Sequence, residues 1–226
     1  MNRSSRMGGR IEYSPIQLEP SQIDRRAYFL LAPDHPDAFG FQEAAERLVA
    51  TCGRRRVLWG TAVGGRRGCS LITLNLATAL AIEHRVALVD IRFDSPALAM
   101  LLGCEDAPLT EKAFVARQSD LNSSIRVGTI GANLAILVAQ GGIGNEIYLS
   151  PGFRSILEDL RRTCDYVFLD GPPIRSLLER EALLMKVDGV VLTVTPDDLA
   201  SGAYESTMQL IPAEQLVGCV MNELDT

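Results

Sequence analysis

Three stretches of the chain place charged, hydroxyl or thiol side chains where a nucleotide phosphate could be bound. The first, residues 57–81, reads as a strand, then the glycine-rich turn GGRRGCS, then a helix. In such a unit the backbone amides and the helix N-terminus cradle phosphate, a lysine neutralises its oxygens and a hydroxyl holds Mg²⁺. Here Ser70 supplies the hydroxyl, but Cys69 stands where the lysine is needed. The turn therefore predicts a phosphate cradle without its central cation.

The other two stretches are apolar strands that end in an aspartate. Asp90 ends VALVD, and Asp170 ends YVFLD. Ligands of parallel sheets bind at the carboxyl ends of the strands, and an aspartate there commonly orders Mg²⁺ and its waters. The sequence leaves a second interpretation open, in which each carboxylate caps a turn or a helix.

The composition is that of a soluble globular protein, and it excludes several classes. The chain has 226 residues, 47% hydrophobic and 22% charged, which suffices for one domain with a sizeable core. A net charge of −6 argues against nucleic-acid binding. No apolar run approaches the ~18 residues of a membrane span, and the N-terminus lacks the apolar core of a secretory signal. We therefore expect a cytoplasmic protein.

The cysteines and histidines do not indicate a metal centre. Five scattered cysteines form no C-x-x-C pair, and there are only two histidines. An odd, unpaired set of cysteines speaks against a disulfide framework or a zinc site and fits a reducing compartment. No metal held by protein side chains alone is predicted.

From residue 40 onward, predicted helices alternate with predicted strands. This order predicts an α/β fold with a mainly parallel twisted sheet flanked by helices in three layers. The expected strands are 56–60, 86–91, 134–139, 166–170, 189–195 and 216–222. The expected helices are 41–52, 70–83, 96–102, 151–162, 176–186 and 200–210. Residues 1–38, rich in Ser, Arg, Pro and Asp, are expected to be a flexible tail with YFLLAP as a docking segment, and 39–226 the domain.

Taken in order, the three stretches resemble the cytoplasmic domain of the bacterial tyrosine kinases of capsule and exopolysaccharide export. These BY-kinases belong with the deviant-Walker P-loop ATPases, and the resemblance covers roughly residues 40–225. The family loop reads S-A-x-P-G-E-G-K-S-T, followed three residues later by N-L-A. Anchoring on N-L-A at 75–77 places the family's lysine on Cys69 and its first hydroxyl on Ser70. The degenerate loop then comprises Gly64, Gly65, Arg66, Arg67, Gly68, Cys69 and Ser70.

The later motifs of the family are kept in outline and altered at charged positions. In V-D-x-D-x-R-x-P, Asp90 matches, but Arg92 stands where the second aspartate belongs. The motif D-[ST]-P-P matches at Asp170, with Gly171 in place of the hydroxyl residue. The resemblance also implies that Asn222, in VMNELD, lies near a nucleotide base.

These departures weaken phosphoryl transfer for electrostatic reasons. An ordinary thiol is uncharged, and a thiolate would repel phosphate. Removing a charge-assisted contact from such a site costs several kcal/mol of transition-state stabilisation. A fixed cation at Arg92 opposes metal binding. Arg66, Arg67 and Arg92 could still hold an anion, or they could be solvated or meet carboxylates of a partner. Cys69 as a nucleophile is the weakest interpretation, because no histidine lies nearby in sequence.

Two further family features are altered. The kinases carry a C-terminal tyrosine cluster, whereas the last tyrosine here is Tyr204. Their E-x-x-R-x-x-R assembly helix corresponds to Glu43, Glu46 and Val49. Glu46 and Val49 thus stand in place of the two arginines, and this change would remove ion pairs from a self-pairing interface. Self-association nevertheless stays an open expectation.

The resulting hypothesis is a binding protein rather than an enzyme. It describes a catalytically degenerate BY-kinase-like domain, without a nucleotide cofactor, that works beside a membrane-anchored polysaccharide co-polymerase to regulate chain length or export. The alternative is an active tyrosine autokinase or weak ATPase that uses ATP or ADP with Mg²⁺ and places Arg66 or Arg67 in the lysine's role. A partitioning or division-site ATPase is a third interpretation, which would need an early loop lysine that 63–65 lack.

Overall fold

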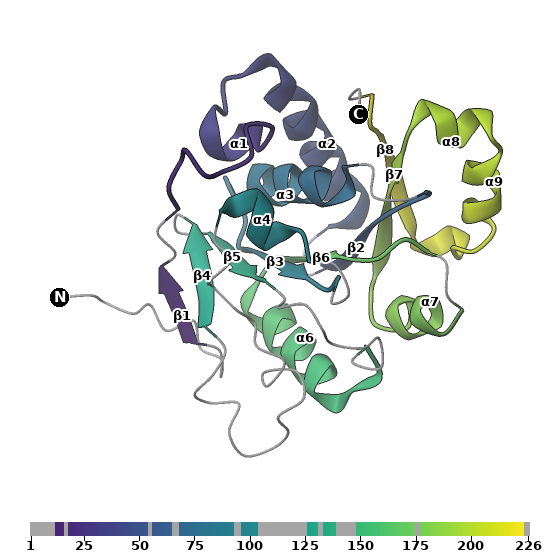
Figure 1. Ribbon diagram of the computed structural model, residues 1–226. Coiled ribbons are helices and arrows are strands. Elements are labelled where there is room, and N and C mark those ends of the chain that lie inside the picture. The colour runs from purple at the N-terminus through teal and green to yellow at the C-terminus, as the bar shows by residue number, and fades with distance from the viewer. Residues whose placement is uncertain are drawn as a thin grey trace.

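The computed structural model describes residues 12–15, 18–53, 56–64, 68–92, 96–103, 126–130, 133–138, 148–174 and 177–223. In these residues a twisted sheet lies between two layers of helices (Figure 1). The α/β architecture predicted from the alternation of strands and helices is confirmed.

The sheet has eight strands in the order β1-β4-β5-β3-β6-β2-β7-β8. Every neighbouring pair is parallel except β4 with β5. The strands are β1 (Glu12–Pro15), β2 (Arg56–Ala62), β3 (Val86–Asp90), β4 (Arg126–Ile130), β5 (Leu134–Leu137), β6 (Tyr166–Asp170), β7 (Gly189–Val194) and β8 (Leu216–Met221). All residues of β3, β5, β6 and β7 are buried, as expected of strands covered on both faces. Strands β1 and β4 were not predicted from the sequence.

One helical layer covers the face of the sheet against which α3 packs. It contains α1 (Tyr28–Leu31), α2 (Pro36–Cys52), α3 (Cys69–Leu80) and α4 (Leu98–Leu102). As predicted from its apolar composition, α3 is buried nearly all round, because α1, α2, α4 and the sheet surround it.

The opposite layer contains α6 (Pro151–Thr163) and α7 (Leu177–Leu184) (Figure 1). The expected start of α6 at Pro151 is confirmed, and the Ser150 hydroxyl caps this helix by accepting from the backbone N–H of Phe153. The single helix expected over 200–210 is replaced by α8 (Pro196–Ala200) and α9 (Ala203–Met208), because Gly202 between them adopts a left-handed conformation. A 3₁₀ turn, η2 (Ala213–Gln215), leads into β8.

The N-terminal part of the chain differs from the expectation of a tail over 1–38. In the described residues 18–38, the side chains of Ile23, Ala27 and Phe29 are buried in the core beneath α3. The Asn75 side chain fixes this segment, accepting from the backbone N–H of Phe29 and donating to the carbonyl of Arg26. The YFLL segment therefore docks on its own domain, and the packed structure crosses the boundary placed at residue 38.

Within the described ranges, the structure contains no helix of the length and apolarity that a membrane crossing requires.

Candidate functional site

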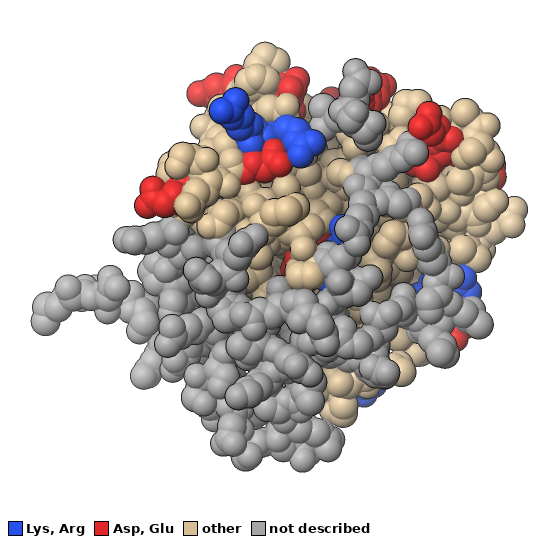
Figure 2. Space-filling model, in the orientation of Figure 1, with Lys and Arg blue, Asp and Glu red and all other residues tan. Residues whose placement is uncertain are grey.

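The candidate site lies where two central strands end beside the start of α3. Asp90 of β3 and Asp170 of β6 are register neighbours, and Gly60 of β2 pairs with Asp170 on its other side. Gly68 precedes α3 with φ 78°, a left-handed conformation that favours glycine. Blue and red atoms are visible deep in the middle of the face in Figure 2, while other charged side chains lie near its rim. The structure thus brings the predicted strand-end carboxylates and the end of the loop together.

The structure describes only part of the predicted loop. Gly65, Arg66 and Arg67 lie outside the described residues. Gly64 is described, and a Cβ added to it would meet Asp198 Oδ1 at 2.9 Å. The described cradle therefore consists of the residues from Gly68 onward and the two strand ends.

Cys69 is buried and chemically quiet. Burial, followed by the charge of Asp170, raises the pKa of its thiol to about 12. Its Sγ lies 3.9 Å from Thr73 Oγ1. A thiol with this pKa is neutral near pH 7, so Cys69 supplies neither the missing cation nor a thiolate nucleophile.

Asp90 has its carboxylate oxygens occupied by the chain itself. Oδ1 accepts from the backbone N–H of Arg92 at 3.0 Å. Oδ2 accepts from the N–H groups of Ala97 at 2.9 Å and Leu98 at 3.0 Å, at the start of α4. Burial raises the pKa of Asp90, while these three hydrogen bonds oppose the rise. The geometry of Asp90 is that of a carboxylate capping a turn and a helix.

Arg92 turns inward toward the first residues of α3. Its side chain is buried, and Nη1 donates to Ser70 Oγ at 3.0 Å. A guanidinium in this position is not on the surface, where a partner's carboxylates would meet it. The hydroxyl that the resemblance assigns to Mg²⁺ is instead hydrogen-bonded to an arginine.

Asp170 differs from Asp90 because its carboxylate is unused. It is fully buried, and neither oxygen has a hydrogen-bond partner among the described residues. Burial, and then the nearby charge of Asp90, raise the pKa of Asp170 to about 8, whereas the Ser70 hydroxyl and the Arg92 charge oppose the rise. Asp170 therefore carries a proton in most molecules at neutral pH.

The arrangement does not fit a divalent cation. Mg²⁺ needs several oxygen ligands in near-octahedral geometry. Ser70 Oγ is engaged by a cation, and both oxygens of Asp90 accept backbone N–H groups. In the described part of the chain no three His, Cys, Asp or Glu residues form a metal-binding group.

Trp59 explains one departure from the family motif, and the sequence analysis missed it. This buried indole on β2 lies directly against Gly171, so that a Cβ at residue 171 would overlap Nε1. The serine or threonine of the family motif therefore has no room here. The available signal was a lone tryptophan within an apolar strand.

Asn222 lies at the cradle, next to the left-handed glycine of the loop. Its backbone N–H donates to the carbonyl of Val194 at 2.7 Å. A Cβ added at Gly68 would lie 2.6 Å from Asn222 Nδ2. Its role toward a base stays a prediction from the resemblance.

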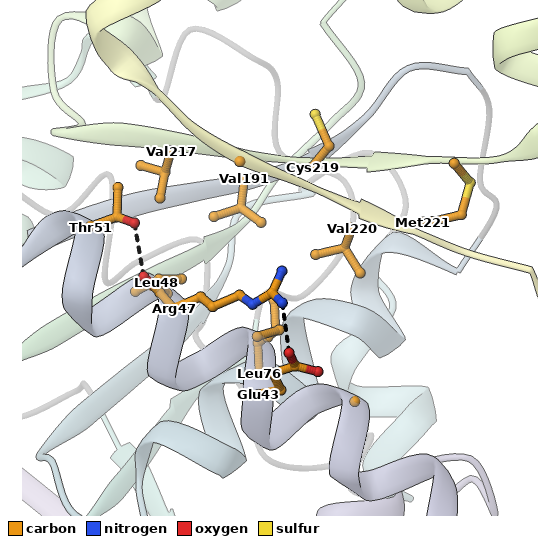
Figure 3. A pocket seen from close by; sticks show the side chains of 13 residues that line it. Glu43, Arg47, Leu48, Thr51, Leu76, Val191, Val217, Cys219, Val220 and Met221 are labelled. Carbon is orange, nitrogen blue, oxygen red and sulfur yellow. Dashed lines mark hydrogen bonds and ion pairs between the residues drawn. The ribbon is translucent and has the colours of Figure 1, made fainter.

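A separate groove of about 420 Å³ lies between α2 and the edge strand β8. Its walls are mostly apolar, and Cys219 on β8 is exposed (Figure 3). On its α2 wall, Arg47 Nη2 pairs with Glu43 Oε1 at 2.7 Å. None of the cradle residues lines this groove.

Comparisons with known proteins give the fold its context. No family model matches the chain. The succinoglycan biosynthesis transport protein ExoP of Rhizobium meliloti is 26% identical over 169 residues, which cover 70% of this chain and 21% of ExoP. The septum site-determining protein MinD of Synechocystis is 25% identical over 173 residues, or 75% of this chain and 65% of MinD. The chain thus spans about a fifth of one relative and just under two thirds of the other.

The solved structures show a stronger likeness in fold than in sequence. The chimerical protein CapA2B2 superposes with a TM-score of 0.77 at 19% identity, covering 91% of this chain and 92% of the other. The chain shares its fold with the kinase domain of the Escherichia coli tyrosine kinase ETK, which superposes with a TM-score of 0.67 at 12% identity over 93% of this chain and 88% of the other. The VpsO kinase domain gives a TM-score of 0.67 at 23% identity over 84% of this chain and 95% of VpsO. MinD of Pyrococcus horikoshii, complexed with Mg-ADP, gives 0.57 at 16% identity over 74% and 68%. The resemblance to BY-kinase domains and to the P-loop NTPase fold is confirmed.

Proposed function

We propose that this chain is a catalytically degenerate member of the tyrosine-kinase-like fold that acts as a binding protein in exopolysaccharide or capsule synthesis. The observation that carries the proposal is the state of Cys69. It stands at the position of the phosphate-neutralising lysine, and burial raises the pKa of its thiol to about 12. Phosphoryl transfer depends on positioned cations, and a buried neutral thiol supplies none.

The site around Cys69 supports the same proposal. Asp90 serves the backbone at the start of α4, and Arg92 is bonded to Ser70. Two of the groups that would orient a metal and its waters are thus engaged within the chain. A cradle whose polar groups bind one another offers little to a Mg²⁺–nucleotide.

The proteins that resemble this chain support the choice of partner class. They include kinase domains, and one sequence relative is named as a succinoglycan biosynthesis transport protein. We infer that the chain binds the cytoplasmic segment of a membrane-anchored polysaccharide co-polymerase and thereby regulates polymer length or export. In this role the domain acts by binding its partner and not by turning over ATP.

The partner is tested by co-purification of the full chain with a co-polymerase from the same organism. We expect complex formation to be equal with ATP and Mg²⁺, with EDTA, and with the variant Asp170→Asn. Loss of the complex on nucleotide removal, or no complex in any condition, would contradict the proposal.

One observation favours a second function, a weak ATPase or tyrosine autokinase. Neither carboxyl oxygen of Asp170 has a hydrogen-bond partner in the described residues, so both could bind a ligand. Radiolabelled ATP with Mg²⁺ separates the two functions. We expect no release of phosphate and no phosphotyrosine. Turnover that disappears in Asp170→Asn would establish the enzyme instead.

A further inference from the structure

The position of the Arg92 guanidinium is the feature that leads beyond the proposed function. Nη1 lies 3.0 Å from Ser70 Oγ, and both residues are buried. In a working phosphate loop, the hydroxyl at this place is a ligand of Mg²⁺. In this chain the atom that faces the hydroxyl belongs to an arginine, so a permanent positive charge occupies the neighbourhood of the metal.

Asp90 holds the backbone of Arg92 at the strand end. The N–H of Arg92 donates to Asp90 Oδ1, two residues earlier, and Asp90 Oδ2 binds the start of α4. The strand end, the arginine and α4 are therefore tied together through one carboxylate. This arrangement fixes the backbone position from which the Arg92 side chain reaches Ser70.

The two buried acids of the cluster are compensated within the chain, Asp170 by a proton and Asp90 by nearby donors and a cation. Asp90 and Asp170 are register neighbours, and both are fully buried. Two carboxylates so close in a low-dielectric interior repel one another unless a proton or a cation compensates them. Arg92 supplies one positive charge, and a divalent metal beside it would add a strong like-charge repulsion.

We propose that Arg92 is a built-in cation that takes the place of the divalent metal in this cradle. The chain then holds its own strand ends and the start of α3 together, and the cradle stays assembled without Mg²⁺. This inference concerns the cation alone and does not depend on the partner proposed above.

The proposal is tested by titrating the full chain with Mn²⁺ and measuring the concentration of free ion by electron paramagnetic resonance. We expect the wild type to bind no Mn²⁺ in the cradle. Arg92→Asp restores a carboxylate at the family's second aspartate position, and we expect it to gain one site. The matched control is Arg154→Asp, which makes the same charge change at an exposed position of α6.

The affinity of Arg92→Asp for Mn²⁺ should exceed that of Arg154→Asp by at least about tenfold. The reason is that only Arg92→Asp removes a buried positive charge from the metal position. Adding Asp170→Asn should abolish the gain. Equal Mn²⁺ binding by Arg92→Asp and Arg154→Asp, with both folded by circular dichroism, would overturn the proposal.

A second measurement needs no variant and covers the case in which Arg92→Asp does not fold. The melting temperature of the wild type is compared in EDTA and in Mg²⁺, with and without ADP. We expect Mg²⁺ to leave the melting temperature unchanged in both pairs. A rise caused by Mg²⁺ would show that the metal binds the native state, and Arg92 could then not be its replacement.

Discussion

The cradle at the ends of β3 and β6 and the groove between α2 and β8 treat their polar groups in opposite ways. In the cradle, Asp90, Arg92 and Ser70 are buried and bonded to one another or to the backbone. In the groove, the Glu43–Arg47 pair is exposed, and most of the other lining side chains are apolar (Figure 3).

The two regions also differ in what the backbone leaves open. The cradle lies over the middle of the sheet, whereas β8 is an edge strand that pairs only with β7 among the described strands. The sequence of β8, LVGCVM, has no charge and no proline, the usual means by which proteins protect such an edge. The chain therefore compensates most polar groups of the cradle internally and keeps accessible apolar surface in the groove beside β8.

The largest expected effect is the loss of the Asp90 carboxylate. Asp90→Ala leaves three backbone N–H groups without their acceptor and the Arg92 guanidinium without a nearby negative charge. We expect a loss of about 3–5 kcal/mol in the free energy of unfolding. In the groove, Glu43→Ala removes an exposed pair and should cost no more than about 0.5 kcal/mol. Urea denaturation measures both. Similar losses at the two positions would abolish the contrast.

The next effect is a pH dependence that arises from Asp170. Its pKa is raised from 3.8 to about 8, so between these values the native state holds a proton that the unfolded chain releases. The contribution of Asp170 to the free energy of unfolding is therefore fully present below pH 3.8 and is lost as the pH rises toward its native pKa. The loss is at most about 1.4 kcal/mol per pH unit. Asp170→Asn should flatten this dependence in denaturation curves recorded from pH 5 to pH 8. An unchanged slope would show that Asp170 is not the group responsible.

A smaller effect concerns the contact between Trp59 and Gly171. Restoring the family's hydroxyl with Gly171→Ser should cost about 1–3 kcal/mol, because the new side chain overlaps the indole. Trp59→Phe leaves a cavity when made alone, but in the double variant it should recover part of the loss. The coupling energy of this double-mutant cycle is the measurement, and additive losses would show that the two residues do not compete for space.

The smallest expected effect on the free energy of unfolding is at Cys219, whose alkylation rate is compared with that of Cys69. Exposed Cys219 in the groove should react with iodoacetamide at least roughly a hundredfold faster than buried Cys69, whose thiol has a pKa raised to about 12. Cys219→Ser should change the free energy of unfolding by less than about 0.5 kcal/mol. Peptide mapping by mass spectrometry after timed labelling gives the rates. Fast labelling of Cys69 in the native protein would mean that the cradle opens readily.

The central strands and the place of the site could be predicted from the sequence alone. Continuous apolar runs such as 166–170 predicted buried parallel strands, and the aspartates that end two of them predicted a shared site. These inferences succeed because they depend on burial along one segment. The edge strand β1 and its neighbour β4 lack such apolar runs and were not predicted from the sequence.

Only the tertiary structure decided how the charged and polar groups are partnered. Asp90 and Asp170 have the same setting in sequence, yet the first caps α4 and the second has no partner in the described residues. Arg92 meets a hydroxyl 22 residues away in the chain, and Asn75 holds a segment 49 residues before it. The sequence by itself determined which central strands are buried and which residue types stand at their ends. The fold decided which of these residues compensate one another, because a hydrogen bond needs two groups within about 3 Å, and groups so far apart in the chain reach that distance only when it folds.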